Sequence, residues 1–316
     1  MKIIVDGFGG DNAPIAVLEG CAAAVKEYGV QLIVTGDEEK LRKTASERNI
    51  SLDGIEIFHA PTVITMHDDP VSLLKAKSDC SMAAAFRLLK EGKGDAFVSG
   101  GSTGAIVVGA NFIIKRLKGV KRAGLATVIP TIKGCYLLMD AGANLDCKPE
   151  TLLHFGIMGS VYMNKVMGIQ NPKVGLVNVG AEDTKGGDLQ KEAYALLQKA
   201  PINFTGNVVL KLTEGLGSMF SKKIKEMFLS GATGKLAAVL MMNKLKDFKK
   251  AMDYTEYGGA PLLGAALPVI KAHGSSNAYA FQNAIRQARD FVAGGVNGEI
   301  QASLQQLAEK AAANEE

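Results

Sequence analysis

The chain has 316 residues, of which 47% are hydrophobic and 22% charged, so it can bury a large core and lacks the composition of a disordered segment. Its formal net charge of +4 is mild: it permits an acidic partner or a membrane surface but does not demand one. Tryptophan is absent and no dense basic stripe with interleaved aromatic residues occurs, so we expect no nucleic-acid partner. We expect one α/β domain over residues 1–316.

The four cysteines lack Cys-x-x-Cys spacing and have no histidine arrangement suited to zinc, which predicts reduced thiols and no metal site. The chain opens on the strand-like residues 2–5, so we expect no signal peptide. No apolar run approaches the length of a membrane span. These features together predict a cytoplasmic protein.

Short apolar runs alternate with helical patterns over most of the chain, which predicts βαβ units and a mostly parallel sheet flanked by helices. The predicted strands are residues 3–8, 31–35, 96–99, 125–129, 136–139 and 174–179. The first predicted helix begins at Pro14. Further helices are predicted over residues 38–48, 71–89, 105–117, 149–166, 189–198 and 276–292. The polar end, residues 311–316, is expected to fray.

Residues 208–253 have a different pattern. Apolar residues recur at helical spacing from 208 to 228 and again from 236 to 252, on either side of a glycine-containing turn at 231–234. Two successive helices without a strand between them predict a helical hairpin that projects from the sheet.

The first loop of interest follows the strand that ends near Met139. It runs from Asp140 to Glu150 and contains Asn144 and Lys148, polar groups placed where a ligand crevice lies in open α/β proteins. A purely structural interpretation is equally open, with Asp146 as the N-cap of the next helix and Pro149 in its first turn.

Two further loops follow predicted strands. In residues 6–12 the third glycine of a dinucleotide-binding fingerprint is replaced by Asn12, which disfavours a nucleotide cofactor and leaves a tight turn as the plain interpretation. In residues 99–105 the hydroxyls of Ser102 and Thr103 either bind an anion or cap the following helix.

Four segments in chain order, residues 5–14, 140–150, 175–186 and 271–277, resemble the phosphate acyltransferase family. The resemblance implies transfer of an acyl group from acyl carrier protein to inorganic phosphate for phospholipid synthesis, with no metal or organic cofactor. It also implies a fold similar to the phosphotransacetylases and isocitrate dehydrogenases, and a homodimer. One departure is that Phe204 runs directly into Thr205, where the family has a connecting segment ending in Asp-Gly-Phe.

The resemblance also implies roles for single residues. We predict that Lys185 and Asn207 stabilise the transition state, with Asn207 opening a helix whose positive end points at the reacting group. Asn178 and His273 are predicted phosphate or substrate contacts. The resemblance also implies that Asp6 and Asp11 line the ligand crevice. The plain alternatives are a solvated Lys185 side chain and a His273 that braces its loop, whose Ser275 or Ser276 would cap the last helix.

Cys147 could be mistaken for a nucleophile, but the direct chemistry needs no covalent step and no histidine lies near it in sequence. Two other functions remain open. One is a phosphotransacetylase that acts on acyl-CoA, and the other is a non-catalytic anion-binding sensor on the same scaffold.

The final prediction concerns the helix at residues 236–252. Met241, Leu245, Phe248 and Met252 share one face, and lysines flank it, a pattern typical of an interfacial membrane helix. A dimer interface or a docking face for the carrier protein would produce the same pattern. Because the family consists of peripheral membrane proteins, we favour the inner face of the membrane.

Overall fold

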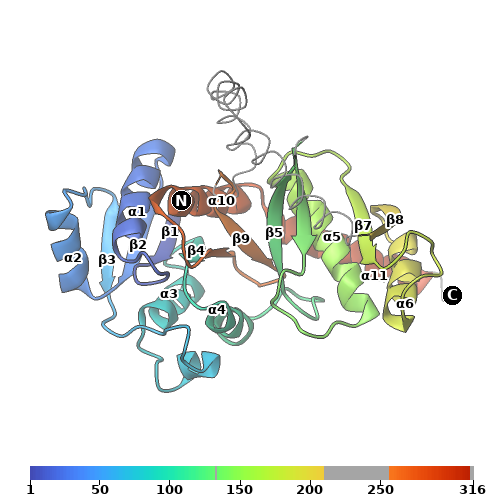
Figure 1. Cartoon of the computed structure of the whole chain (residues 1–316), viewed down its shortest axis with the longest axis horizontal. Helices are drawn as coiled ribbons and strands as arrows, with labels where there is room; N and C mark the ends of the chain where they lie inside the picture. Colours follow the sequence, from blue (N-terminus) through green and yellow to red (C-terminus); the bar gives the residue numbers. More distant parts are fainter. Residues whose placement is uncertain (132–133, 210–255, 314–316) are drawn as a thin grey trace, which may run out of the picture.

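The computed structural model describes residues 1–131, 134–209 and 256–313 (Figure 1). In this part of the chain an eight-stranded sheet has the order β3-β2-β1-β4-β10-β9-β5-β6, and β7 and β8 form a second, two-stranded sheet. The strands are β1 Lys2–Asp6, β2 Gln31–Gly36, β3 Ile55–His59, β4 Ala96–Ser99, β5 Gly124–Thr131, β6 Gly134–Met139, β7 Lys173–Asn178, β8 Asn203–Val209, β9 Gly259–Leu263 and β10 Val269–Ala272.

The large sheet is parallel from β3 to β10 and antiparallel from β10 to β6. The pair β7–β8 is parallel. The predicted fold class, a mostly parallel sheet flanked by helices, is therefore confirmed. The parallel pairing of β1 with β4 and of β4 with β10 puts the carboxyl ends of these three strands next to one another at one edge of the sheet.

Side chains on β1 show why helices cover both faces of the parallel half. Ile3 and Val5 are buried in one core cluster with residues of α1 and α10. Ile4, between them, is buried in a second cluster with residues of α3 and α4. Since successive side chains of a strand point to opposite faces, an unbroken apolar strand is the expected sequence for a sheet covered on both sides.

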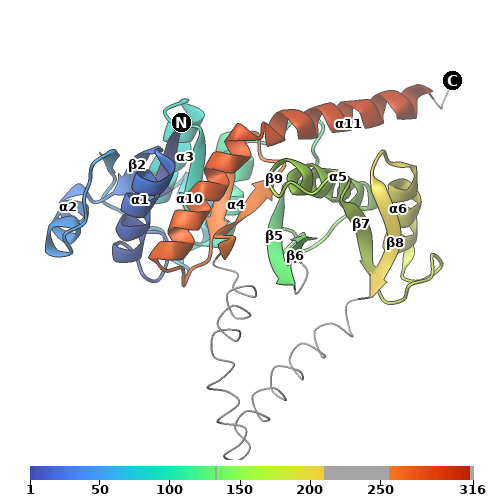
Figure 2. The same ribbon diagram turned by 90° about the horizontal axis from the view of Figure 1, so that it is seen from above.

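The helices lie in layers on the sheet. Figure 2 shows α1 and α10 side by side, and α11 continuing from α10 towards α5 and α6. The helices and helical turns are α1 Ile15–Tyr28, α2 Glu38–Glu47, the 3₁₀ turn η1 Pro70–Leu74, α3 Ser81–Lys90, α4 Thr103–Gly109, the π turn η2 Ala110–Ile114, α5 Pro149–Lys165, α6 Asp188–Lys199, α10 Ala278–Ala293 and α11 Val296–Ala313. None of these helices is long and apolar enough to cross a membrane.

Several predicted boundaries were wrong. The helix predicted over 71–89 is broken between η1 and α3, because Cys80 is extended and its sulfur caps α3 by accepting from Ala83 N. The last predicted helix starts at Ala278, where the cap is Asn277 rather than Ser275 or Ser276. The sequence pattern did not reveal β3, β8, β9, β10 or α11.

The predicted helix from Val208 is also wrong at its start. Asn207 and Val208 lie in β8, paired with Leu176 and Val177 of β7. The rest of the predicted hairpin, including Met241, Leu245, Phe248 and Met252, lies outside the described residues.

The contact between α1 and α10 depends on Gly20. A Cβ atom at this position would lie 2.6 Å from the Ala278 carbonyl oxygen and 2.7 Å from the Phe281 Cβ. We therefore expect Gly20→Ala to lower the free energy of unfolding by about 1–3 kcal/mol through overpacking, measured by urea denaturation.

The matched control is Gly298→Ala in α11, where a Cβ would meet no atom within 4 Å. Helix propensity alone predicts that this change stabilises the protein by up to about 1 kcal/mol. Equal effects of the two substitutions would contradict the close packing of α1 on α10.

Candidate active site

Three loops meet at the carboxyl ends of β1, β4 and β10. Asp11 N donates to the Gly274 carbonyl at 2.7 Å, and the Asn12 carboxamide donates to Ser275 O at 3.2 Å. A Cβ on Gly10 would lie 2.9 Å from Gly274 O, so the β1–α1 and β10–α10 loops touch through their backbones. Because neighbouring parallel strands end at one edge, this is where an α/β fold forms its ligand crevice.

A buried carboxylate fixes the third loop. Asp6 is only 2% exposed and accepts from Ser81 Oγ at 2.7 Å and from Ser99 Oγ at 2.8 Å. Ser99 Oγ in turn accepts from Gly101 N at 3.0 Å. Burial raises the pKa of Asp6, while the hydrogen bonds from the two serines and from the Phe8 amide oppose that shift. Through Ser99, Asp6 thus holds the glycine-rich loop of residues 99–105 in place.

Lys271 on β10 is the buried cation of this edge. Its side chain lies under the same loop, 7% exposed, with Nζ 3.5 Å from Gly100 O and in contact with Ala272 O. Burial lowers the pKa of Lys271 to about 8, and the negative charge of Asp11 opposes this shift.

The other predicted groups of this edge have partly structural partners. Ser102 accepts from Ala105 N at 3.4 Å and so caps α4, and Thr103 is the first residue of that helix. His273 Nδ1 lies 2.8 Å from Ser275 Oγ and accepts from Ser275 N. Asp11 is exposed.

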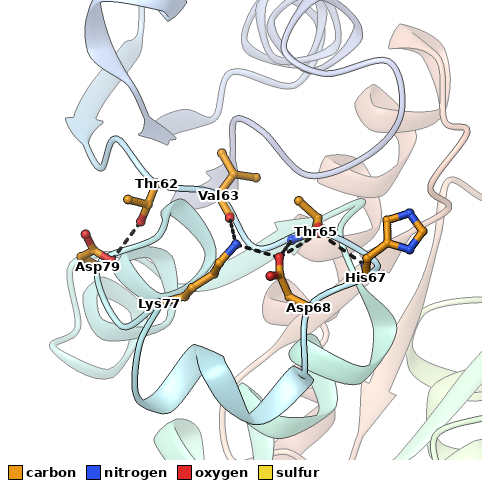
Figure 3. Close-up of polar contacts among 7 residues, drawn as sticks. All are labelled: Thr62, Val63, Thr65, His67, Asp68, Lys77 and Asp79. Atoms are coloured by element: carbon orange, nitrogen blue, oxygen red, sulfur yellow. Dashed lines mark hydrogen bonds and ion pairs between the residues drawn. The ribbon is translucent and has the colours of Figure 1, made fainter.

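The segment between β3 and α3 forms an outer wall of the same region (Figure 3). Lys77 Nζ donates to Val63 O at 2.9 Å and pairs with Asp68 at 2.7 Å, while Asp68 also accepts from the amide and hydroxyl of Thr65. Met66, in this segment, would be 3.8 Å from a Cβ on Gly274.

The residues predicted to carry the chemistry lie elsewhere, around β7 and β8. Asn207 Nδ2 donates to Glu182 O at 2.7 Å, and Lys185 N donates to the same carbonyl at 3.1 Å. Asn178 Nδ2 donates to Lys185 O at 3.0 Å. The structure therefore brings Lys185, Asn178 and Asn207 together, with the Lys185 side chain exposed.

The prediction that Asn207 opens a helix does not hold, since the residue is inside β8. A helix dipole is therefore no part of its action. What remains is its carboxamide, whose Oδ1 is buried without a hydrogen-bond partner among the described residues. Buried polar atoms are usually paired, so this oxygen is available to accept a hydrogen bond.

The Asp140–Glu150 loop is mainly braced from within. Asp140 accepts from the amides of Leu125, Ala143 and Asn144, and Asn144 Nδ2 donates to Ala123 O at 2.8 Å. Lys148 is exposed and occupies the N-cap position of α5. It makes no side-chain cap bond there, so the alternative with Asp146 as cap is wrong, whereas Pro149 does lie in the first turn.

Burial of Cys147, reinforced by the nearby Asp140 charge, raises its pKa. A thiol held protonated is a poor nucleophile, which agrees with a direct reaction.

Sequence reasoning missed Ser81, Ser99 and Lys271. A signal for Lys271 was present, because a lysine within the short run Val269–Ala272 interrupts an otherwise apolar strand. Ser81 carried no such signal, since its partner Asp6 is 75 positions away.

An apolar pocket of about 500 Å³ lies between the free edges of β6 and β7, covered by α5. Leu137, Phe155, Met163 and Leu176 are among its lining residues. At one end Gln190 reaches the loop of Lys185, because its Oε1 accepts from Gly187 N at 3.0 Å.

Comparison with solved structures shows which class of protein has this fold. The chain matches a phosphotransacetylase from Streptococcus pyogenes with a TM-score of 0.62 and 18% identity, covering 92% of this chain and 94% of that one. The EutD phosphotransacetylase from Staphylococcus aureus gives a TM-score of 0.58 at 19% identity with the same coverages. The fold is therefore that of the phosphotransacetylases.

Sequence relatives identify the family. The phosphate acyltransferase of Alkaliphilus oremlandii is 45% identical over 314 residues, covering 92% of this chain and 94% of the relative. That of Clostridioides difficile is 42% identical over 339 residues, covering all of both chains. The model of the family described as fatty acid synthesis protein matches residues 1–204 and 200–299. The chain belongs to the phosphate acyltransferase family.

Asp68 holds the segment between β3 and α3, residues 60–80, through its contacts with Thr65 and Lys77. Its hydrogen bonds and ion pair lower the pKa of Asp68 to about 2, with the bond from Lys77 as the largest cause. A carboxyl with a lowered pKa stabilises the fold above its unfolded pKa, and this contribution is lost as the pH falls towards 2. We expect Asp68→Asn to speed amide hydrogen exchange of residues 62–79 a few-fold at pH 7, measured by mass spectrometry.

Asp53→Asn, at the exposed turn before β3, is the control and should leave exchange in 62–79 unchanged. Identical exchange in wild type and Asp68→Asn would show that the ion pair does not hold this segment.

Proposed function

We propose that the protein transfers an acyl group from the thioester of acyl carrier protein to inorganic phosphate. A phosphate oxygen attacks the thioester carbonyl, a C–O bond forms, and the C–S bond breaks. The products are acyl phosphate and the carrier thiol, which takes up a proton. No metal or organic cofactor enters this reaction.

Family membership supports the reaction class, and one observation from the fold supports the mechanism. The backbone amide of Lys185 and the side-chain carboxamide of Asn207 both donate to the Glu182 carbonyl, so the two residues are held close together. Attack on a thioester creates a tetrahedral oxyanion, and preorganised donors are the largest source of its stabilisation. In our proposal the Lys185 ammonium pairs with the phosphate or the oxyanion. The Asn207 carboxamide donates to the same group.

The polar loops around β1, β4 and β10 supply candidates for phosphate binding. Ser102, Thr103 and His273 lie on loops whose backbones touch, with Asn144, Lys148 and Asn178 as further candidates on the other half. Asp6 acts through Ser99 rather than on a ligand, because its oxygens are occupied by protein donors.

The apolar pocket beside β7 supports an acyl substrate. Its volume of about 500 Å³ falls in the range typical of small-molecule sites, and its lining is largely aliphatic and aromatic. One end of the pocket lies at Gln190, next to the loop that positions Lys185.

Acyl-CoA is the competing substrate, favoured by the fold shared with phosphotransacetylases. The two are separated by measuring phosphate-dependent thiol release from acyl carrier protein and from acyl-CoA at equal concentration. A preference for acyl-CoA would identify the protein as a phosphotransacetylase. Tight anion binding without turnover of either thioester would indicate a non-catalytic anion-binding sensor.

We further propose that the protein works as a homodimer at the cytoplasmic face of the membrane, in phospholipid synthesis. Its product is a reactive lipid phosphate that partitions into bilayers, and the sequence of residues 236–252 has the pattern of an interfacial helix.

The catalytic proposal predicts a large and selective loss of turnover. Lys185→Ala and Asn207→Ala should each lower kcat about a hundredfold or more, as expected for loss of an oxyanion donor, while the unfolding midpoint stays near that of wild type. Lys191→Ala on α6 and Asn203→Ala on β8 are matched controls that should keep normal kcat. Near-normal turnover in both active-site variants would remove these residues from the mechanism.

The membrane proposal predicts binding to anionic vesicles. Wild-type protein should co-sediment with vesicles rich in anionic lipid, and Leu245→Glu should remain in the supernatant while still dimeric and active, because a charge on the apolar face opposes insertion. Equal pelleting, or dissociation of the variant, would assign this face to protein contacts.

A further inference from the structure

Lys271 is a buried charge without a carboxylate partner among the described residues. Its side chain is 7% exposed, and its printed hydrogen bonds are to two main-chain carbonyls, Gly100 O and Ala272 O. No carboxylate of the described residues lies within ion-pair distance of it. Burial of an unpaired charge is strongly unfavourable, so such groups usually pair with an ion or act in function.

The surroundings of this lysine are suited to an anion. Its ammonium lies under the loop of residues 99–105, 3.5 Å from Gly100 O, and supplies positive charge there, while the Gly101 amide is already bonded to Ser99 Oγ. Lys271 pairs in register with Ser99 across β10 and β4, so the charge and the loop share one sheet edge. His273, two residues further on, reaches the same edge with its loop.

We propose that Lys271 binds the substrate phosphate, and that the phosphate supplies the counter-charge which the described residues lack. This inference rests on the proposed function and adds to it a phosphate contact at the loops that follow β1, β4 and β10, apart from Lys185 and Asn207 around β7 and β8. Asp11, whose negative charge opposes the lowered pKa of Lys271, is exposed and lies on a separate loop.

A purely structural role makes a different prediction. If Lys271 only ties Gly100 O to β10, its removal should lower the stability of the loop, and any loss of phosphate affinity should be explained by that loss of stability. If it is an unpaired charge kept for binding, Lys271→Met should fold at least as stably as wild type, because an apolar side chain of similar length replaces a buried cation. Phosphate binding should nevertheless weaken.

The first measurement needs no turnover. Inorganic phosphate should raise the Tm of wild type, since a ligand that binds only the folded state stabilises it. Lys271→Met should require about tenfold to a hundredfold more phosphate for the same rise, the range expected for loss of a hydrogen bond to a charged group. Lys26→Met, exposed in the last turn of α1, is the control and should behave as wild type.

The second measurement uses kinetics of the whole enzyme. In Lys271→Met the KM for phosphate should rise by a similar factor, while the KM for the acyl thioester stays unchanged. A wild type without turnover would refute the proposed function, yet the thermal measurement would still decide the role of the lysine. Unchanged phosphate affinity in Lys271→Met overturns the inference.

A third measurement covers the case of a variant that fails to fold. Reductive methylation of wild type, read by mass spectrometry, should label Lys271 several-fold less in saturating phosphate than without it, with Lys26 labelled equally in both. Equal labelling of Lys271 with and without phosphate would overturn the inference on the native protein itself.

Discussion

The parallel alignment of β1, β4 and β10 is the constraint on which the candidate site at their carboxyl ends depends. Their register places Asp6, Ser99 and Lys271 at the same level of the sheet. Because parallel neighbours end on one side, the three following loops must meet, whatever their sequence separation. The loops meet there through backbone atoms: a Cβ on Gly10 would lie 2.9 Å from Gly274 O, and a Cβ on Gly100 would lie 2.8 Å from Gly9 O. Close approach therefore requires glycine at positions 10 and 100.

Two buried ionisable groups lie under these loops, and they differ in how the fold treats them. Asp6 is surrounded by donors from Ser81, Ser99 and the Phe8 amide, so its burial serves rigidity. Among the described residues, Lys271 has main-chain acceptors only. A paired buried group stabilises a loop, whereas a buried charge without a counter-charge costs stability unless an ion pairs with it. The same edge of the sheet thus contains Asp6, which holds a loop in place, and Lys271, which supplies a buried positive charge.

The sequence predicted the parts of the fold that depend on local pattern. The helices near 149–166 and 189–198 and the strands around 96–99 and 174–179 have strong periodicity and clear ends, and they were found. Pairing over long distances was not accessible. Residues 208 onward fit a helical spacing, yet Asn207 and Val208 join β8 because β7 offers a partner strand. The break before α3 depends on Lys77 and Thr62 reaching back across a loop, which no period reveals.

The region where this chain departs from its relatives lies near the apolar pocket and not at the loops that follow β1, β4 and β10. The Clostridioides difficile relative aligns over more residues than this chain contains, and the family match is split at residue 204. Phe204 and Thr205 lie in β8, which pairs with β7, the strand that bounds the apolar pocket and the break between the two sheets. Residues added at this point would enter next to that pocket. The loops around Asp6, Ser99 and Lys271 are far from it in sequence and lie within the matched ranges. Structural differences between this chain and its relatives are therefore expected beside the apolar pocket and not at the loops that follow β1, β4 and β10.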